Sequence, residues 1–221
     1  MATLTNIIDR VTAWADESIC QKVSLKVPPN DSDEPDKEKA GETEKNEKRA
    51  TGAGYSYKAV HPACFPLFVP TGDKLPPKIN TPIPSLCVRI VDGEDGTHMG
   101  IVNLEMCFSV WNPGVHGRDM LKPIGDPMHY EEWKGSEAEA YFQRSASGWR
   151  DVWNWIDTAL RELESTISID GLQIDREKGI KYGPLKEDEG IPDYYPFWFA
   201  YISFSLKRPI VRDVKQYENF L

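Results

Sequence analysis

The stretch WRDVWNWIDTALREL, residues 149–163, decides the fold that we predict for this chain. Drawn as an α-helix, it gathers its apolar side chains on one face at i, i+3, i+4 and i+7 spacing. The residues of that face are Trp149, Val152, Trp153, Ile156, Ala159, Leu160 and Leu163. Ser147 offers a hydroxyl to the first turn. Each tryptophan brings roughly 150–250 Å² of surface, so the helix needs a flat apolar partner, which predicts a sheet.

The strongest strand signal precedes this helix. Apolar and polar residues alternate over 85–90 and again over 102–110, and the segment 92–96, Asp-Gly-Glu-Asp-Gly, lies between them. Alternation on both sides of an Asp/Gly turn predicts an antiparallel hairpin.

Further elements are predicted on both sides of the hairpin and the helix. Residues 197–206 alternate in the same way and predict a last strand, and a shorter strand is predicted at 172–174. Near the N-terminus, apolar residues recur at helical spacing over 4–19 and then alternate over 23–27. This order predicts a helix followed by a short strand.

Two long segments interrupt the pattern. Residues 30–50 hold eight acids and five bases but no large apolar side chain, so they cannot bury enough surface to offset their ordering entropy. We interpret them as a solvated or disordered insertion, with ordering on a partner as the alternative. Residues 115–146 are too long for an ordinary connection and form a second insertion. The whole chain, 1–221, is predicted to be one α+β domain.

Composition restricts the classes of function. The formal net charge of −9 and the pI near 5.0 disfavour binding to a nucleic-acid backbone, which needs clustered Lys and Arg. No apolar run approaches the roughly 18 residues of a membrane span, and the N-terminus lacks the pattern of a secretory signal. We therefore expect a cytosol-like compartment. The four cysteines are scattered without a CxxC pair, so no disulfide framework is predicted.

Signals for catalysis are weak. His61 and Cys64 form an HxxC pair, but a closed zinc site needs a second pair, and His98 is expected to face solvent. The chain has no GxSxG, HExxH or glycine-rich phosphate motif. We therefore predict no catalytic, cofactor or metal site. A small cytosolic metal-dependent hydrolase that uses His61, Cys64, His116 and His129 remains the enzymatic alternative.

An excess of aromatic residues points to protein interfaces instead. Trp155 lies off the predicted apolar stripe, Trp111 ends a strand, and Phe199 and Tyr201 lie on the second face of the last strand. Interfaces are enriched in such rings. These four residues are our candidate interface, and the alternative is that they cap a large core or pack against the insertion.

Four sequence stretches carry a resemblance to a known family. They are PSLCVRIVDG at 84–93, GWRDVWNWI at 148–156, YYPFWFAYISF at 194–204 and RPI at 208–210. In this order the chain resembles the tail terminator, or tail completion, proteins of tailed bacteriophages and prophages. The resemblance covers about 1–27 and 84–211.

The resemblance implies a structural protein without catalysis. It implies an α+β subunit with a mainly antiparallel sheet of four or five strands, on which the helix Gly148–Thr166 and the N-terminal helix pack. Copies of the subunit would form a ring, expected to be a hexamer, that caps the tail tube, stops its growth and joins the head connector. The expected partners are further copies of the chain, the tail tube protein, connector or neck proteins and, in a contractile tail, the sheath protein. The expected location is the virion, and another neck adaptor is the alternative.

Overall fold

The structure is a computed structural model. It describes residues 3–28, 58–79, 81–96, 99–112, 146–186, 194 and 196–209, together with the backbone of 122–124 and 126–131. The predicted insertion at 30–50 lies outside the described residues. Within the predicted insertion at 115–146, the structure describes only the backbone of the hairpin β6 (Lys122–Ile124) and β7 (Asp126–Glu131), and the first residue of a short 3-10 helix.

Two α-helices form where the apolar periodicity predicts them. Helix α1 (Leu4–Ser18) begins after Thr3, whose hydroxyl accepts a hydrogen bond from the Asn6 amide at 3.2 Å. Helix α5 (Arg150–Ser165) follows the short 3-10 helix η4 (Ala146–Trp149). Two other 3-10 helices are η1 (Cys20–Lys22) and η2 (Gly72–Lys74).

The main sheet is curled and mostly antiparallel. Its strands, in spatial order, are β3 (Ala63–Pro66), β4 (Ser85–Asp95), β5 (Met99–Trp111), β11 (Phe197–Pro209), β9 (Leu172–Ile174) and β8 (Ser168–Ile169), with β10 (Lys181–Pro184) also paired to β11. Only the β3–β4 pair is parallel. A separate two-stranded sheet joins β1 (Leu25–Lys26) to β2 (Ala59–Val60).

The predicted hairpin and last strand form the centre of the sheet. Strands β4 and β5 pair antiparallel, with an irregularity between Ile90 and Asp92. Strands β5 and β11 pair over their whole length, from Phe197 opposite Trp111 to Pro209 opposite Met99. The even-numbered residues of β11 from 200 to 206 are buried, as the alternation predicts.

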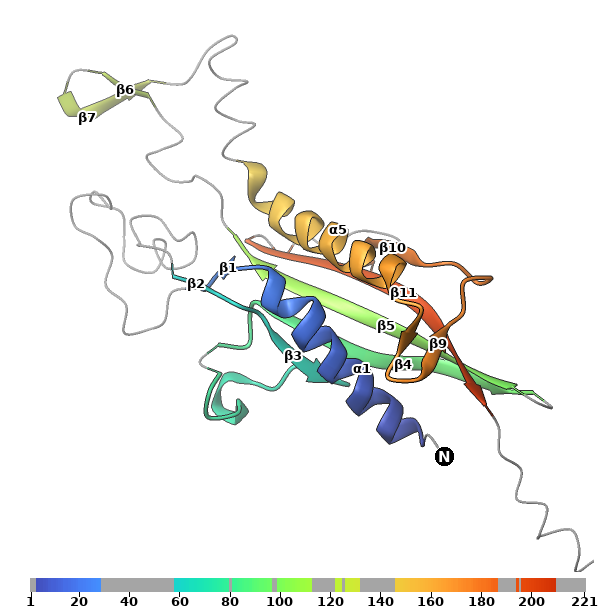
Figure 1. The fold of residues 1–221 in the computed structure, drawn as a ribbon. Coiled ribbons are helices and arrows are strands. Elements are labelled where there is room, and N and C mark those ends of the chain that lie inside the picture. The colour runs from blue at the N-terminus through green and yellow to red at the C-terminus, as the bar shows by residue number, and fades with distance from the viewer. Residues whose placement is uncertain are drawn as a thin grey trace, which may run out of the picture.

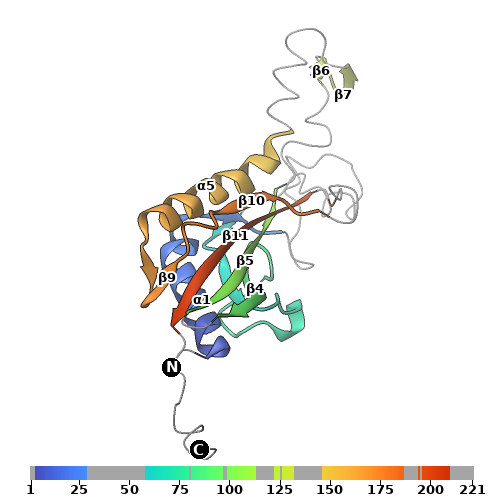
Figure 2. The same cartoon turned by 90° about the vertical axis from the view of Figure 1, so that its right-hand side faces the viewer.

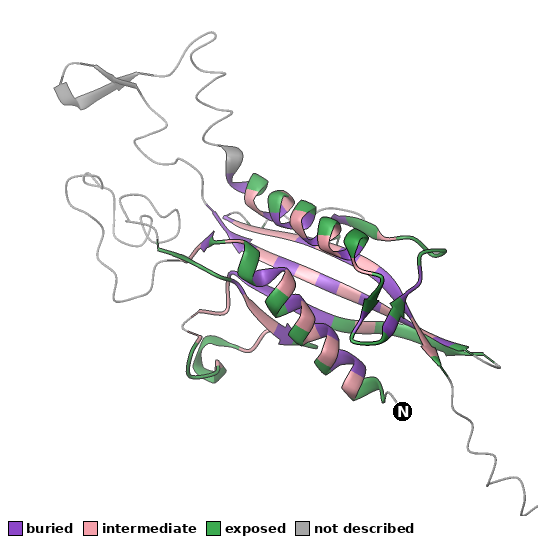
Figure 3. Cartoon of the chain, viewed as in Figure 1, coloured by how far each residue is buried: buried purple, intermediate pink, exposed green. Residues whose placement is uncertain are grey.

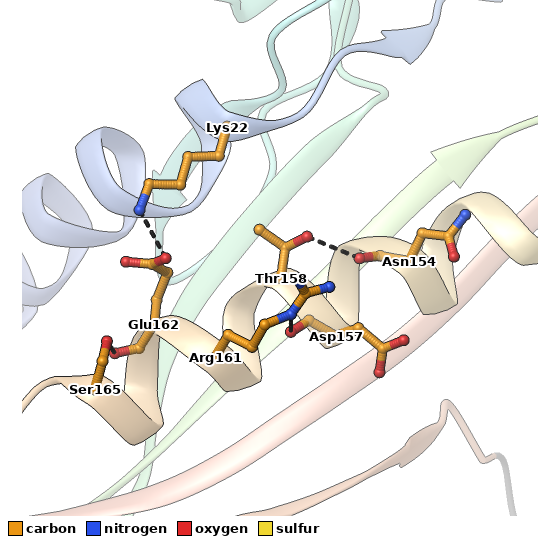
Figure 4. A network of polar contacts seen from close by, with 7 residues as sticks. All are labelled: Lys22, Asn154, Asp157, Thr158, Arg161, Glu162 and Ser165. Atoms are coloured by element: carbon orange, nitrogen blue, oxygen red, sulfur yellow. Dashed lines mark hydrogen bonds and ion pairs between the residues drawn. The ribbon is translucent and has the colours of Figure 1, made fainter.

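Both α-helices lie on the same face of the sheet (Figures 1 and 2). Helix α1 packs against β3, β4 and β8, and α5 packs against β5 and β11. Each helix is buried on its sheet side and exposed on the other (Figure 3). The Lys22 ammonium, just after α1, forms an ion pair with the Glu162 carboxylate of α5 at 2.6 Å (Figure 4). The core therefore lies between this helical layer and the sheet.

The expected number of strands is wrong. We predicted four or five strands, whereas the main sheet has seven. The missed strands include β3, which lies in a proline-rich stretch, and β10, which ends in Gly183 and Pro184. Prolines are tolerated on edge strands, where a missing N–H breaks no ladder bond, so local sequence signals conceal such strands.

The predicted buried face of the main helix also needs correction. Trp149 is 42% exposed, and the Arg150 guanidinium lies 5.6 Å from its ring centre. Trp155 takes the place in the core and is fully buried. The buried positions Val152, Trp155, Ile156, Ala159 and Leu163 still follow helical spacing. The helix is therefore rotated relative to our prediction.

A buried polar junction holds the two ends of segment 113–147 together. The Asn112 amide donates to the Asp151 carboxylate at 2.6 Å, and its side-chain oxygen accepts from the Lys26 ammonium at 3.1 Å. The Trp198 indole donates to the Asn112 carbonyl at 2.8 Å. Gly148 packs so closely on that carbonyl that a β-carbon would lie 2.2 Å from the oxygen. Asn112 and Gly148 are therefore held against each other at one point of the domain.

Candidate interaction surfaces

Two of the four predicted interface residues are core residues. Trp155 is fully buried and meets the Phe108 ring edge to face at 4.9 Å, and Trp111 is only 1% exposed. The expectation that these rings are exposed is wrong. Trp155 packs between α5 and the sheet, and Trp111 is buried although alternation along β5 places it on the sheet face of Phe199 and Tyr201. The Trp155 indole cannot meet a partner without unfolding part of the core.

The other two predicted residues lie on the sheet face opposite the α-helices. Phe199 and Tyr201 are partly exposed, and neither of the described α-helices covers this face. The Tyr194 ring packs edge to face on Phe199 at 5.6 Å, and the Tyr201 ring lies beside Gly183 of β10. These two rings remain a predicted contact surface.

One open edge of the sheet is acidic. Strand β3 pairs only with residues 85–88 of β4, so among the described strands none lies beside residues 89–95 on that side. The Val88 carbonyl accepts from the Leu67 amide at 2.8 Å, so the groups on this side of β4 are able to pair. Beyond that point the exposed acids Asp92, Glu94 and Asp95 follow. Asp95 forms an ion pair with Arg208 and Asp92 accepts a hydrogen bond from Asn103, so Glu94 is the acid that neither contact occupies. We call residues 89–95 the acidic edge.

The opposite edge is basic. Lys178, Lys181 and Lys186 are exposed, and none forms an ion pair with another described residue. Residues 178–186, which we call the basic edge, include β10 and contain no acid. The Leu185 amide donates to the Phe199 carbonyl at 3.2 Å, so by alternation the Tyr182 backbone faces away from β11.

A groove opens between α1 and strand β3. Its volume is about 720 Å³, within the range of roughly 300–1,000 Å³ of binding pockets. One wall holds Asp9, Thr12, Ala13 and Asp16 of α1, and the other is built from residues 58–66 and 78–84. Burial raises the pKa of Asp16, although a hydrogen bond from Gln21 opposes this shift. No local sequence pattern predicts this groove, because its walls are distant in the chain.

The residues of the enzymatic alternative do not come together where the structure describes them. The His61 ring lies 2.7 Å from the Val23 carbonyl through Nδ1, and the Cys64 thiol contacts Cys20 instead. The side chains of His98, His116 and His129 lie outside the described residues. Within the described part of the chain, no three His, Cys, Asp or Glu side chains are placed to share a metal ion.

The four cysteines form two neighbouring pairs. Cys20 contacts Cys64, and Cys87 lies directly opposite Cys107 in the β4–β5 ladder. The hydrogen bond with Cys64 and burial raise the pKa of Cys20. Burial also raises the pKa of Cys87 to about 11 and that of Cys107 to about 12. All three therefore stay protonated at neutral pH, which makes them poor nucleophiles.

Comparisons with known proteins do not identify a family for this chain. No protein-family model matches the chain, and searches of curated proteins and of solved structures find no significant match. None of the described helices is long and apolar enough to span a membrane.

Proposed function

We propose that this chain is a structural subunit of a bacteriophage virion, which forms a ring of about six copies at the end of the tail tube and joins it to the head connector. The resemblance of four sequence stretches to tail terminator proteins motivates the proposal. The observation that supports ring formation is the pair of open sheet edges with opposite charge.

The charges select the symmetry of the contact. Two acidic edges repel each other, as do two basic edges, so neither favours a two-fold contact. The acidic edge of one copy attracts the basic edge of the next. Such a head-to-tail contact is heterologous, and heterologous contacts close into rings when the rotation between copies allows it. A ring is therefore the closed assembly that these edges favour.

The backbone groups of the two edges complement the charges. Beyond Val88 the outer side of β4 has no described strand beside it, and on β10 the backbone of Tyr182 faces outward. Pro184 also faces outward, where its missing N–H breaks no bond to β11. Pairing across the contact would be short, so we expect charge and side-chain packing to supply most of its specificity.

Charge reversal tests this arrangement. Glu94→Lys places a base on the acidic edge, and Lys181→Glu places an acid on the basic edge. Each single variant should shift the midpoint concentration of ring assembly upward by about tenfold or more, because like charges then meet. The double variant restores opposite charges and should regain rings. Light scattering and negative-stain images over a concentration series measure the assembly.

Glu164→Lys on the exposed side of α5 is the matched control, because it changes the net charge as Glu94→Lys does without touching either edge. Single variants that form rings as readily as wild type would refute the role of the edges. A wild-type chain that stays monomeric at every concentration, and also when mixed with tail tubes, would refute the proposed function.

A further inference from the structure

We propose that the groove between α1 and β3 binds an extended peptide segment of a partner protein, which adds to the sheet as a strand beside β3 with basic side chains facing α1. This inference goes beyond the proposed ring, because it involves neither the acidic nor the basic edge.

Strand β3 offers a free edge inside the groove. The Ala63 amide donates to the Pro84 carbonyl at 3.4 Å and the Leu67 amide donates to the Val88 carbonyl at 2.8 Å, so these two residues face β4. Alternation along the strand turns the backbone of Cys64 away from β4. Cys64 lines the groove, and among the described strands none lies on that side of β3. Its N–H and C=O are therefore placed to pair with an added strand. Pro62 and Pro66 on the same side have no N–H, and the Pro66 carbonyl accepts from the Phe68 amide at 2.8 Å, so backbone pairing is limited to Cys64.

Helix α1 supplies the second wall of the groove. Asp9, Thr12, Ala13 and Asp16 follow i, i+3, i+4 and i+7 spacing, so they form one stripe along the helix. This stripe lies next to the core stripe of Ile7, Ile8, Val11 and Ala15. A sheet edge beside a helix is the geometry in which edge strands capture peptides: the backbone supplies affinity and alternate side chains supply specificity.

The shape and the charges of the groove indicate which kind of peptide it binds. Ala13 leaves space in the helical wall, and the apolar residues Val60, Pro62 and Ile79 line the remainder. Asp9 and Asp16 make the helical wall negative, whereas Lys58 and Lys78 belong to the other wall. The negative wall attracts basic side chains and the positive wall repels them. A bound strand is therefore oriented with its basic side chains towards α1. The chain's formal charge of −9 favours a basic peptide further.

A peptide library supplies the probe. Fluorescent peptides of about ten residues, the upper length of a typical strand, with randomised side chains are selected on the full-length chain. We expect enrichment of Lys or Arg at alternate positions. Affinity of the best peptide is then measured by fluorescence polarisation. N-methylation of a single backbone amide at the centre of that peptide should weaken binding by about tenfold, because strand addition needs the N–H.

Two groove variants and two matched controls locate the site. Ala13→Trp fills the groove from an exposed position, and the double variant Asp9→Lys with Asp16→Lys reverses the charge of the helical wall. Each should weaken binding by about tenfold or more. The controls Asn154→Trp and Asp157→Lys with Glu164→Lys make the same changes on the exposed face of α5. They should bind within about twofold of wild type.

Three results would overturn the inference: no enrichment of basic residues, equal affinity in groove and control variants, or binding that tolerates N-methylation at every central position. Far-ultraviolet circular dichroism confirms that each variant folds. Ring assembly is measured on the same proteins, and the groove variants should assemble like wild type. Failure of peptide binding with intact rings would therefore refute the groove alone, not the proposed function.

Discussion

Replacing Trp155 by alanine tests the central correction to the predicted interface. Trp155 is fully buried against Phe108, so its side chain removes roughly 150–250 Å² from water. At about 25 cal/mol per Å² this burial is worth about 4–6 kcal/mol. The buried indole N–H has no hydrogen-bond partner in the described structure. Removing this unpaired donor offsets about 1–3 kcal/mol of the lost burial energy. We therefore expect Trp155→Ala to lower the free energy of unfolding by about 3 kcal/mol, at the low end of measured Trp→Ala losses.

Two further variants separate burial from surface contact. Trp155→Phe keeps an aromatic ring and removes the unpaired N–H, so it should cost less than about 2 kcal/mol. Trp149→Ala removes a ring that is 42% exposed and lies beside Arg150, and it should cost less than about 1 kcal/mol. Urea unfolding followed by far-ultraviolet circular dichroism measures all three without relying on tryptophan fluorescence. If Trp155→Ala lowers the free energy of unfolding by less than about 1 kcal/mol and also weakens assembly, Trp155 is an interface residue and the core assignment is wrong.

Three more predictions concern the junction, a buried ion pair and the thiols. Gly148→Ala should lower the unfolding free energy by about 1–3 kcal/mol in urea titrations, because its β-carbon would overlap the Asn112 carbonyl. Asp175→Asn should cost about 1.5–3 kcal/mol in the same assay, since the carboxylate is buried and has an ion-pair partner at 3.2 Å. Because the folded pKa values of Cys87 and Cys107 are raised to about 11 and 12, their contribution to stability is full below pH 9. It should fall as pH rises from about 9 to 12, because the unfolded thiols ionise at a lower pH than the folded ones.

Matched variants control these three predictions. Gly72→Ala adds a β-carbon that meets no atom within 4 Å and should leave stability unchanged. Asp157→Asn removes an exposed carboxylate and should do the same. The alkaline loss is the difference between wild type and the double variant Cys87→Ala with Cys107→Ala, which cancels the titration of lysine and tyrosine. Parallel stability curves for the two proteins above pH 9 would contradict the thiol prediction.

Sequence patterns predicted the centre of the fold because the information there is local. Every second residue of β5 from 100 to 110 and of β11 from 200 to 206 is buried, and a shift of one residue in register would turn this face to the other side. Periodicity also located α5, but not its rotation. Apolar residues occupy positions 149, 152, 153, 155 and 156, so two overlapping stripes fit a helical period. Contact with Phe108 on β5, which is remote in sequence, selects the stripe that includes Trp155.

The surfaces were harder to predict because they depend on which strands lie at the edges. Residues 92–95 were interpreted only as a turn, yet they extend β4 past the end of β3. No strand is predicted from the sequence at 178–186, yet this segment contains the edge strand β10 and three lysines, one of them in the strand. Charge on an edge strand and charge in a loop have the same local pattern. Only the order of the strands in the sheet shows that the acidic and basic segments lie at opposite edges.

The same strand order shows that the proposed ring contact and the groove are compatible. A neighbouring β10 paired to the acidic edge would lie beside β4, in the row that β3 occupies farther along the strand. A peptide added to β3 lies one row farther out, because β3 separates it from β4. Rows of a sheet are about 4.8 Å apart, so the two additions contact different strands at different ends of β4. Closing a ring through the sheet edges would therefore leave the free edge of β3, and the wall of α1 that faces it, open to a partner.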